Sequence, residues 1–212
     1  MECWLVRHGE STWNLDERFQ GGQDPPLSRR GRVQAAALAA RLAGMAFTGL
    51  YTSPLTRARE TAAVCASVLG LTPEPVDDLR EMGLGAWEGL TVKAVQTSAG
   101  DAYRCWRDAP ADHPPPGGEL LEVVAERTAR VLARVGTDSG EGPALVVSHG
   151  GVIASLLCRW LGFSLNELWR FRLANVSITR VALPAGRLLV LNDTSHLAAR
   201  SEERRVGKEC RL

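Results

Sequence analysis

The stretch LVRHGESTWN, residues 5–14, ends an apolar run at an arginine, a histidine and a glycine. Leu5 and Val6 belong in a hydrophobic core, whereas Arg7 and His8 are costly to bury without a partner. We therefore expect a buried strand whose polar end meets an anionic group.

The same succession of an apolar run, a polar turn and a helical segment occurs three times in the chain. The apolar runs are residues 3–6, 50–52 and 144–147, and the turns after them are RHG, SPLTR and SHGG. Strands that alternate with helices at this spacing predict an α/β fold with three layers, α/β/α, and a mostly parallel central sheet. Ligands bind at the carboxyl ends of the strands in such sheets, where all three turns are expected to lie.

The segment after the first turn has the spacing of an amphipathic helix. Ser28 is the expected N-terminal cap, and the helix is expected to end near Leu42. Its apolar positions are predicted to share one face, which comprises Val33, Ala37 and Ala40.

Length and composition indicate one domain. The chain has 212 residues, 45% of them hydrophobic, which suits a single core over residues 1–199. Residues 98–118 form a long segment without a regular pattern, typical of a lid-like insertion at a binding site. Residues 200–212 are highly charged and lack periodicity, so we expect a solvated tail or a cloning or assembly scar.

Charge and cysteine content disfavour several functions. The 25 basic and 24 acidic residues create no overall field, so neither nucleic acid nor a membrane is an expected partner. No apolar run reaches the roughly 20 residues of a membrane span, and charges near the start argue against an export signal. The five cysteines include no C-x-x-C pair, which argues against disulfides and zinc and favours a cytoplasmic location.

The three polar turns carry the groups that phosphoryl transfer requires. Neutral His8 is a candidate nucleophile if an acceptor holds its other ring nitrogen. Arg7 and Arg57 can bind a phosphate dianion, and His149 adds a donor that strengthens in the transition state. A buried structural ion pair of Arg7 and His8 is the alternative, but matching chemistry in separate turns makes it the weaker interpretation.

Glu81 is the candidate proton donor. It lies in DDLREMGLGAWEGL, residues 77–90, where apolar neighbours can raise its pKa by desolvation. A protonated carboxyl can release the leaving alcohol and then, as a base, activate water. An ordinary solvated loop glutamate is the alternative, and the local sequence favours neither.

Four ordered blocks resemble a known family. They are RHGESTWN, SPLTRARETA, LREMGLGAWEG and VVSHGG. Together they resemble the histidine phosphatase superfamily, in the phosphoglycerate mutase-like branch that includes α-ribazole phosphatases and broad-specificity phosphatases. The resemblance extends over residues 3–198, and RHG alone would be a weak signal.

The resemblance implies a role for individual residues. It makes His8 the transiently phosphorylated histidine, Arg7 and Arg57 the pocket arginines, His149 the second histidine and Glu81 the proton donor. The residues that it implies for substrate binding are Asn14, Gln20 and Gly21. The family uses no metal or cofactor, which agrees with the absence of a carboxylate cluster of metal-ligand type from the sequence.

We therefore predict a phosphomonoester hydrolase, an acid-type histidine phosphatase that forms a phosphohistidine and acts on a small phosphorylated metabolite without metal. A cofactor-dependent phosphoglycerate mutase is the main alternative. It is disfavoured because Met82 and Leu84 stand in the segment where mutases carry an arginine and a tyrosine. A noncatalytic phospholigand binder is the second alternative, although a binder needs no proton donor. A homodimer is compatible with the sequence.

Aromatic residues are candidates for contacts with the leaving group. We expect such contacts from Phe19, Trp13 and Trp106, whereas Trp160 and Trp169 are expected in the core.

Overall fold

A single six-stranded sheet forms the centre of the computed structural model, which describes residues 1–138, 140, 142–184 and 186–198. The strand order is β3-β2-β4-β1-β5-β6. The strands are β1 (Glu2–Arg7), β2 (Gly49–Thr52), β3 (Glu74–Pro75), β4 (Ala144–Ser148), β5 (Ile178–Ala182) and β6 (Arg187–Asp193). The first four pair in parallel, whereas β5 is antiparallel to both of its neighbours. The predicted mostly parallel sheet is confirmed.

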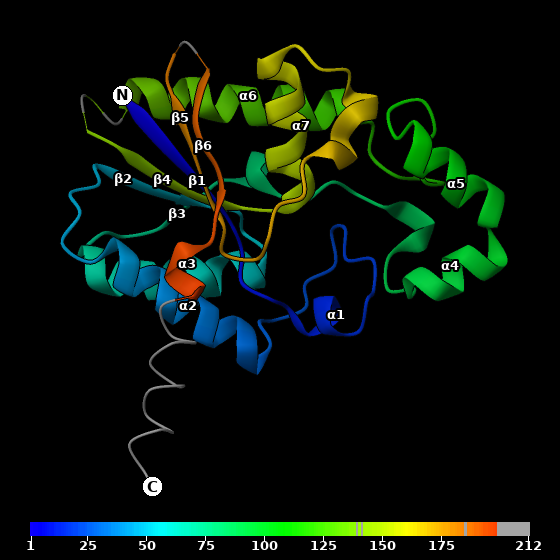
Figure 1. The fold of residues 1–212 in the computed structure, drawn as a ribbon, viewed down its shortest axis with the longest axis horizontal. Coiled ribbons are helices and arrows are strands. Elements are labelled where there is room, and N and C mark those ends of the chain that lie inside the picture. The colour runs from blue at the N-terminus through cyan, green and yellow to red at the C-terminus, as the bar shows by residue number, and fades with distance from the viewer. Residues whose placement is uncertain (139, 141, 185, 199–212) are drawn as a thin grey trace, which may run out of the picture.

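Helices cover both faces of the sheet and give the predicted three layers (Figure 1). On one face lie α2 (Arg29–Leu42) and α3 (Thr56–Leu69). On the other face lie α6 (Leu121–Asp138) and α7 (Gly150–Leu161). Crossovers of this kind bring the carboxyl ends of β1, β2 and β4 to the same edge of the sheet.

The alternation of side chains along β1 divides the core into two halves. Cys3 and Leu5 pack in the hydrophobic cluster that includes α6 and α7. Trp4 and Val6 point the other way, into the cluster that includes α2 and α3. Because both faces of β1 are buried, its sequence is continuously apolar up to the polar turn.

The start of α2 is as predicted, but its buried face is not. The Ser28 hydroxyl accepts a hydrogen bond from the backbone N–H of Gly31 at 2.9 Å, which caps the helix. Of the three residues predicted to share its apolar face, Ala37 is buried, whereas Val33 and Ala40 are exposed. The face is rotated because α2 packs against α3 as well as against the sheet.

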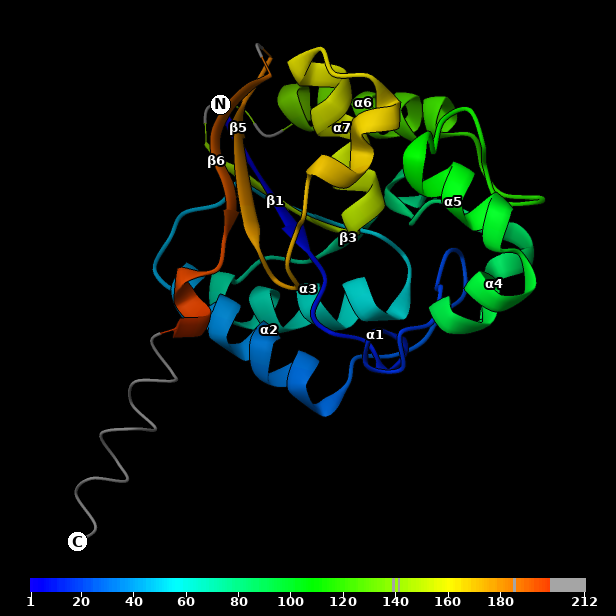
Figure 2. The same ribbon diagram turned by 45° about the vertical axis from the view of Figure 1, so that its right-hand side comes forward.

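The segment 98–118 is more regular than the sequence predicted. Residues Gly100–Asp108 form α5, directly after α4 (Val92–Ser98), and only the part after α5 lacks helix and strand. Tyr103 and Trp106 of α5 pack against the hydrophobic cluster that includes α6 and α7. This burial stabilises the helix, although the prolines that follow it are typical of a loop. Figure 2 shows α4 and α5 together beside the edge of the sheet.

Short helices occupy the connections near this edge. They are α1 (Thr12–Leu15) and the 3₁₀ helices η1 (Asp77–Leu79), η2 (Gly85–Trp87) and η3 (Leu165–Arg170). The predicted tail, residues 200–212, lies outside the described residues. Within the part of the chain that is described, no helix is long and apolar enough to cross a membrane.

Candidate active site

The candidate nucleophile lies at the carboxyl end of β1. The backbone N–H of His8 donates to Ser148 O at the end of β4, at 2.9 Å. The ring Nδ1 of His8 lies 2.6 Å from Gly9 O. Because a carbonyl oxygen can only accept, Nδ1 carries the proton and Nε2 keeps its lone pair. This is the tautomer that attack on phosphorus requires.

The surroundings of His8 keep its ring neutral. The residue is 2% exposed, and this burial lowers its pKa well below the ordinary value of 6.5. The positive charges of Arg57 and Arg7 lower the pKa of His8 further. A neutral imidazole is therefore present at physiological pH.

The second histidine meets the first edge-on. His149 follows β4, and its ring centroid lies 5.0 Å from that of His8. Its Nε2 lies 2.8 Å from Ser53 Oγ, and its Nδ1 is buried with no hydrogen-bond partner among the described residues. Burial, and then the charge of Arg57, lower the pKa of His149 well below 6.5, so this ring is neutral as well.

Arg57 is buried in the first turn of α3. Its guanidinium group donates to Gln23 O at 2.7 Å and to Gly21 O at 3.0 Å. Burial lowers the pKa of Arg57 to about 10, which leaves the group charged at neutral pH. Its Nε is buried and has no partner in the described part of the chain.

Arg7 approaches the same place from the end of β1. Its Nη1 donates to Leu173 O at 2.6 Å, and its Nε is a second buried donor without a partner among the described residues. A Cβ atom on Gly150 would lie 3.4 Å from this Nε, at van der Waals distance, so the first residue of α7 lies close to the guanidinium group. Two unsatisfied N–H donors beside a neutral imidazole form a site that an oxyanion can complete.

Glu81 completes the cluster from the segment between η1 and η2. Its carboxylate accepts the N–H of Met82 at 3.1 Å and that of Gly151, in the first turn of α7, at 3.4 Å. A Cβ on Gly151 would lie 2.8 Å from Glu81 Oε1, so glycine permits this approach. Burial lowers the pKa of both Arg7 and Arg57, and the negative charge of Glu81 partly offsets this fall, which is the effect of a carboxylate close to both.

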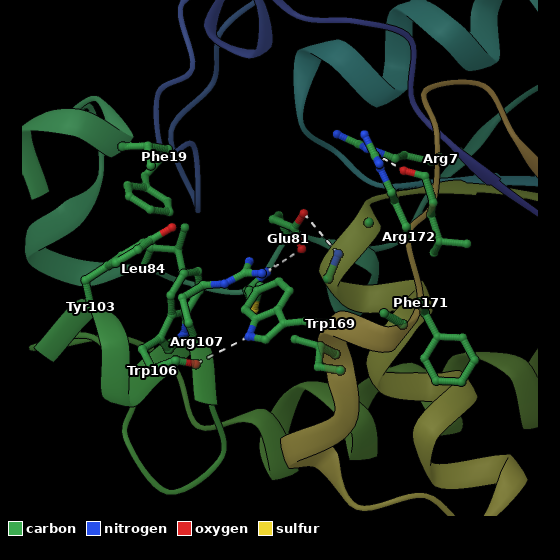
Figure 3. Close-up of a pocket in the computed structure, with 17 residues that line it drawn as sticks. Arg7, Phe19, Glu81, Leu84, Tyr103, Trp106, Arg107, Trp169, Phe171 and Arg172 are labelled. Carbon is green, nitrogen blue, oxygen red and sulfur yellow. Dashed lines mark hydrogen bonds between the residues drawn. The ribbon is translucent and has the colours of Figure 1, made fainter. Parts of the chain in front are cut away.

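A cavity of about 570 Å³ lies beside this cluster (Figure 3). Arg7, Glu81 and Gly150 form its polar end. The rest of its wall consists of aliphatic side chains, Arg107, Arg172 and the rings of Phe19, Tyr103, Trp106, Trp169 and Phe171.

The structure thus gathers the five predicted catalytic residues at one edge of the sheet. Arg7 and Glu81 line the cavity, whereas His8, Arg57 and His149 are almost fully buried and do not line it. No group of three or more His, Cys, Asp or Glu side chains in the described part of the chain is arranged to hold a metal ion.

The three predicted substrate-binding residues do not line this cavity. The Asn14 side chain accepts from Ser11 N at 3.1 Å, and that of Gln20 accepts from Ser11 Oγ at 2.9 Å. Both therefore stabilise the turn that follows the RHG motif, and the Gly21 carbonyl orients Arg57. Direct contact of these residues with a substrate stays a prediction.

The aromatic predictions are partly wrong. Phe19 and Trp106 line the cavity as expected, but Trp13 does not. Trp169 packs against the core as expected and also lines the cavity from η3, where its indole N–H donates to Trp106 O at 3.3 Å. Trp160 is half-buried against the core, in line with the prediction.

Sequence reasoning missed a clamp behind Glu81. Arg127 of α6 donates to Asp78 O at 2.6 Å and pairs with Glu119 at 2.9 Å. It also donates to Glu81 O at 3.4 Å, and Glu119 accepts from Gly83 N at 3.2 Å. The pair thereby holds the backbone on both sides of the candidate acid. The ordinary spacing of Arg127 within a helix gave no signal of this role.

A second missed clamp holds the backbone of the RHG motif. Val176 N donates to Arg7 O at 2.9 Å, and Asn175 Nδ2 donates to His8 O at 3.1 Å. Val176 has φ 53°, a left-handed conformation that costs a β-branched residue about 1–2 kcal/mol. In this conformation, Val176 and its neighbour Asn175 both donate to the backbone carbonyls of the motif that carries the candidate nucleophile.

Comparisons with known sequences agree with the geometry. The sequence model of the histidine phosphatase superfamily (branch 1) matches residues 3–194. The chain is 35% identical over 195 residues to phosphoserine phosphatase 1 of Hydrogenobacter thermophilus. This match covers 91% of this chain and 92% of that protein. It is 33% identical over 172 residues to the adenosylcobalamin/α-ribazole phosphatase of Escherichia coli, 81% of this chain and 85% of that protein.

Solved structures and mutase-like sequences are similar as well. A mycobacterial glucosyl-3-phosphoglycerate phosphatase in complex with VO3 superposes with a TM-score of 0.82 at 31% identity, over 91% of this chain and 99% of that chain. A probable phosphoglycerate mutase of Salmonella choleraesuis is 30% identical over 207 residues, 94% of this chain and 96% of that protein.

Proposed function

This chain belongs to branch 1 of the histidine phosphatase superfamily, and we propose that it hydrolyses a small phosphomonoester through a phosphohistidine formed on His8. The observation that carries the proposal is the buried neutral ring of His8, whose Nδ1 proton is held by Gly9 O. The named phosphatases among its relatives support the same reaction class. Acid-type histidine phosphatase is the name of a different family, so that narrower expectation is withdrawn.

The first step transfers the phosphoryl group to the protein. The lone pair of His8 Nε2 attacks phosphorus, and the bond from phosphorus to the ester oxygen breaks. Glu81 in its carboxylic acid form gives its proton to the leaving oxygen, so that an alcohol departs. Arg7 and Arg57 hold the non-bridging oxygens, to which each offers a buried Nε donor with no partner among the described residues.

The second step restores the enzyme. Glu81, now a carboxylate, takes a proton from a water molecule whose oxygen attacks phosphorus. The bond from phosphorus to His8 Nε2 breaks, inorganic phosphate forms, and the imidazole returns to its neutral state. The same carboxyl group thus serves as acid and then as base, which is supported by its position in the cavity wall close to both arginines.

Hydrolysis is favoured over the mutase reaction by the residues that follow Glu81. Met82 and Leu84 line the cavity with apolar side chains. Neither side chain can bind the acid group of a phosphoglycerate, and the arginine and tyrosine expected of a mutase are absent from this segment. Transfer of the phosphoryl group to water needs no such contacts.

Three expectations accompany the proposal. We propose that the protein binds a small phosphorylated metabolite. We further propose that the protein binds neither nucleic acid nor membrane and acts in the cytoplasm. A homodimer is compatible with the proposed reaction.

The proposal is tested with the full chain and its His8→Ala variant. Hydrolysis of p-nitrophenyl phosphate in excess chelator and an acid-labile, base-stable protein phosphate are expected for the wild type. Both should disappear in the variant, with activity reduced at least about 10³-fold because no nucleophile remains. The matched control is His113→Ala, which removes an exposed loop histidine and should change neither.

Retention of full activity by His8→Ala would overturn the proposal. Phosphoryl transfer that requires a bisphosphate primer, with no release of inorganic phosphate, would favour the mutase instead.

A further inference from the structure

The proposed catalytic groups leave part of the cavity unexplained. Two further arginines line it, Arg107 from α5 and Arg172 after η3, and Glu81 is the sole acidic side chain among its lining residues in the described part of the chain. Neither arginine has an ion-pair partner among the described residues. The cavity is therefore more cationic than binding of one phosphate requires.

Arg107 is held in place without being neutralised. Its guanidinium carbon lies 4.7 Å from the centroid of the Trp169 ring. Trp169 is itself fixed, because its indole N–H donates to Trp106 O at 3.3 Å and the two rings lie 4.6 Å apart. Figure 3 shows the guanidinium group directed from α5 toward Glu81. Such a preorganised cation loses little entropy when it binds an anion.

Arg172 stands on the opposite wall of the cavity. The next residue, Leu173, supplies the carbonyl that anchors Arg7 at 2.6 Å. Figure 3 shows the Arg172 side chain extended toward Arg7. A ligand whose phosphate binds Arg7 therefore has one free cation close to its phosphate and another across the cavity.

We propose that the site selects phosphomonoesters whose leaving group carries a carboxylate, with Arg107 as its main ligand and Arg172 as a second cation. This inference rests on the proposed function. A guanidinium group held over an indole ring still has its N–H donors available, and two of them can bind a planar carboxylate in parallel. The aromatic wall then encloses the short carbon chain between phosphate and carboxylate.

The test compares two esters that differ in one group. In 3-phosphoglycerate a carboxylate replaces the hydroxymethyl group of glycerol 3-phosphate. For the wild type we expect kcat/KM to be about 10- to 100-fold higher for the carboxylate, the effect of one charged hydrogen-bonded pair. Arg107→Gln should remove most of this preference by raising KM for 3-phosphoglycerate, with little change for glycerol 3-phosphate. Arg107→Lys should restore part of it.

A matched control lies on the same helix. Arg104 is exposed and paired with Asp101, so Arg104→Gln makes the same change of charge away from the cavity and should leave both esters unaffected. Arg172→Gln provides a second variant and should lower the preference by a smaller factor. Thermal unfolding of each variant shows that it is folded.

Three results would overturn the inference. They are equal kcat/KM for the two wild-type reactions, equal losses for both esters in Arg107→Gln, and a preference for a bisphosphate over the phosphate carboxylate. A protein that hydrolyses p-nitrophenyl phosphate through His8 but gives one of these results retains the proposed function and loses only this inference. A protein that hydrolyses no ester loses the proposed function itself.

Discussion

The two ends of the cavity are built from different kinds of structure. At the polar end, the proposed catalytic groups lie at the ends of β1 and β4, at the start of α3 and between η1 and η2, and several are held by main-chain atoms. At the far end, α5 and η3 provide aromatic rings, and α5 also provides the exposed Arg107. The first arrangement fixes reacting atoms on a rigid sheet, whereas the second rests on helices that can change without disturbing it. Chemistry and selection are thereby separated in space.

Removal of the proposed acid, Glu81, should impair catalysis at the polar end of the cavity and leave the far end unchanged. For Glu81→Gln we expect kcat for an alkyl phosphate to fall about 10²- to 10⁴-fold, because the alkoxide leaves without a proton. The loss should be much smaller for p-nitrophenyl phosphate, since p-nitrophenolate is a good leaving group. Steady-state rates with both esters check this. Equal losses would mean that Glu81 acts as a structural or binding group.

Removal of the clamp behind Glu81 should affect both stability and chemistry. Arg127→Met leaves Glu119 unpaired in a largely buried place, and we expect the free energy of unfolding to fall by about 2–3 kcal/mol. We also expect a lower kcat with little change in KM, because the backbone of Glu81 loses an anchor. Urea unfolding and steady-state kinetics measure the two effects.

The control for the clamp is an exposed arginine of the same helix. Arg134→Met breaks ion pairs with Glu74 and Asp138 at the surface, where solvent screens them, so it should change the stability little and leave kcat unchanged. Arg127→Met combined with Glu119→Gln should recover part of the lost stability. Equal losses of stability and of kcat in Arg127→Met and Arg134→Met would show that Arg127 does not hold the backbone of Glu81.

The polar end should also make stability depend on pH. His8 and His149 are neutral in the folded chain because burial lowers the pKa of each well below 6.5. In the unfolded chain both take up protons as the pH falls through about 6.5, so the unfolded state binds more protons. Stability should therefore decrease from about pH 6.5 downward, toward the lowered pKa values of the folded state.

The size of this effect is up to about 1.4 kcal/mol per pH unit for each ring. Urea unfolding at several pH values below 6.5 measures it. His8→Gln should reduce the slope, whereas His113→Gln, in an exposed loop, should not. A slope unchanged by His8→Gln would show that this ring is not held neutral in the folded state.

The strand ends were predictable because their signal is local. In β1 a continuous apolar run stops at Arg7 and His8, and a buried parallel strand produces that pattern wherever it occurs. The position of α5 was less accessible, because Trp106 is buried by partners distant in the sequence, Trp87 and Trp169. Neither the helix propensity of the segment nor its proline content indicates the contacts of Trp106 with these two residues.

The clamps were hidden for the same reason. Arg127 looks like any arginine of an amphipathic helix until the fold places it behind Glu81. Asn175 and Val176 reach the RHG motif only because β5 pairs with β1. The family resemblance pointed to the reacting residues, and the three-dimensional arrangement supplied the residues that support them.

The central position of β1 has a consequence for how the chain acquires its structure. Leu5 pairs with Val146 on one side and with Thr179 on the other, so β1 is synthesised more than a hundred residues before either of its partners. Contacts of such long sequence separation slow folding, because a large loop must close before they form. A nascent chain therefore carries the His8 imidazole on an unpaired strand, and the candidate site is complete only after β5 has been synthesised.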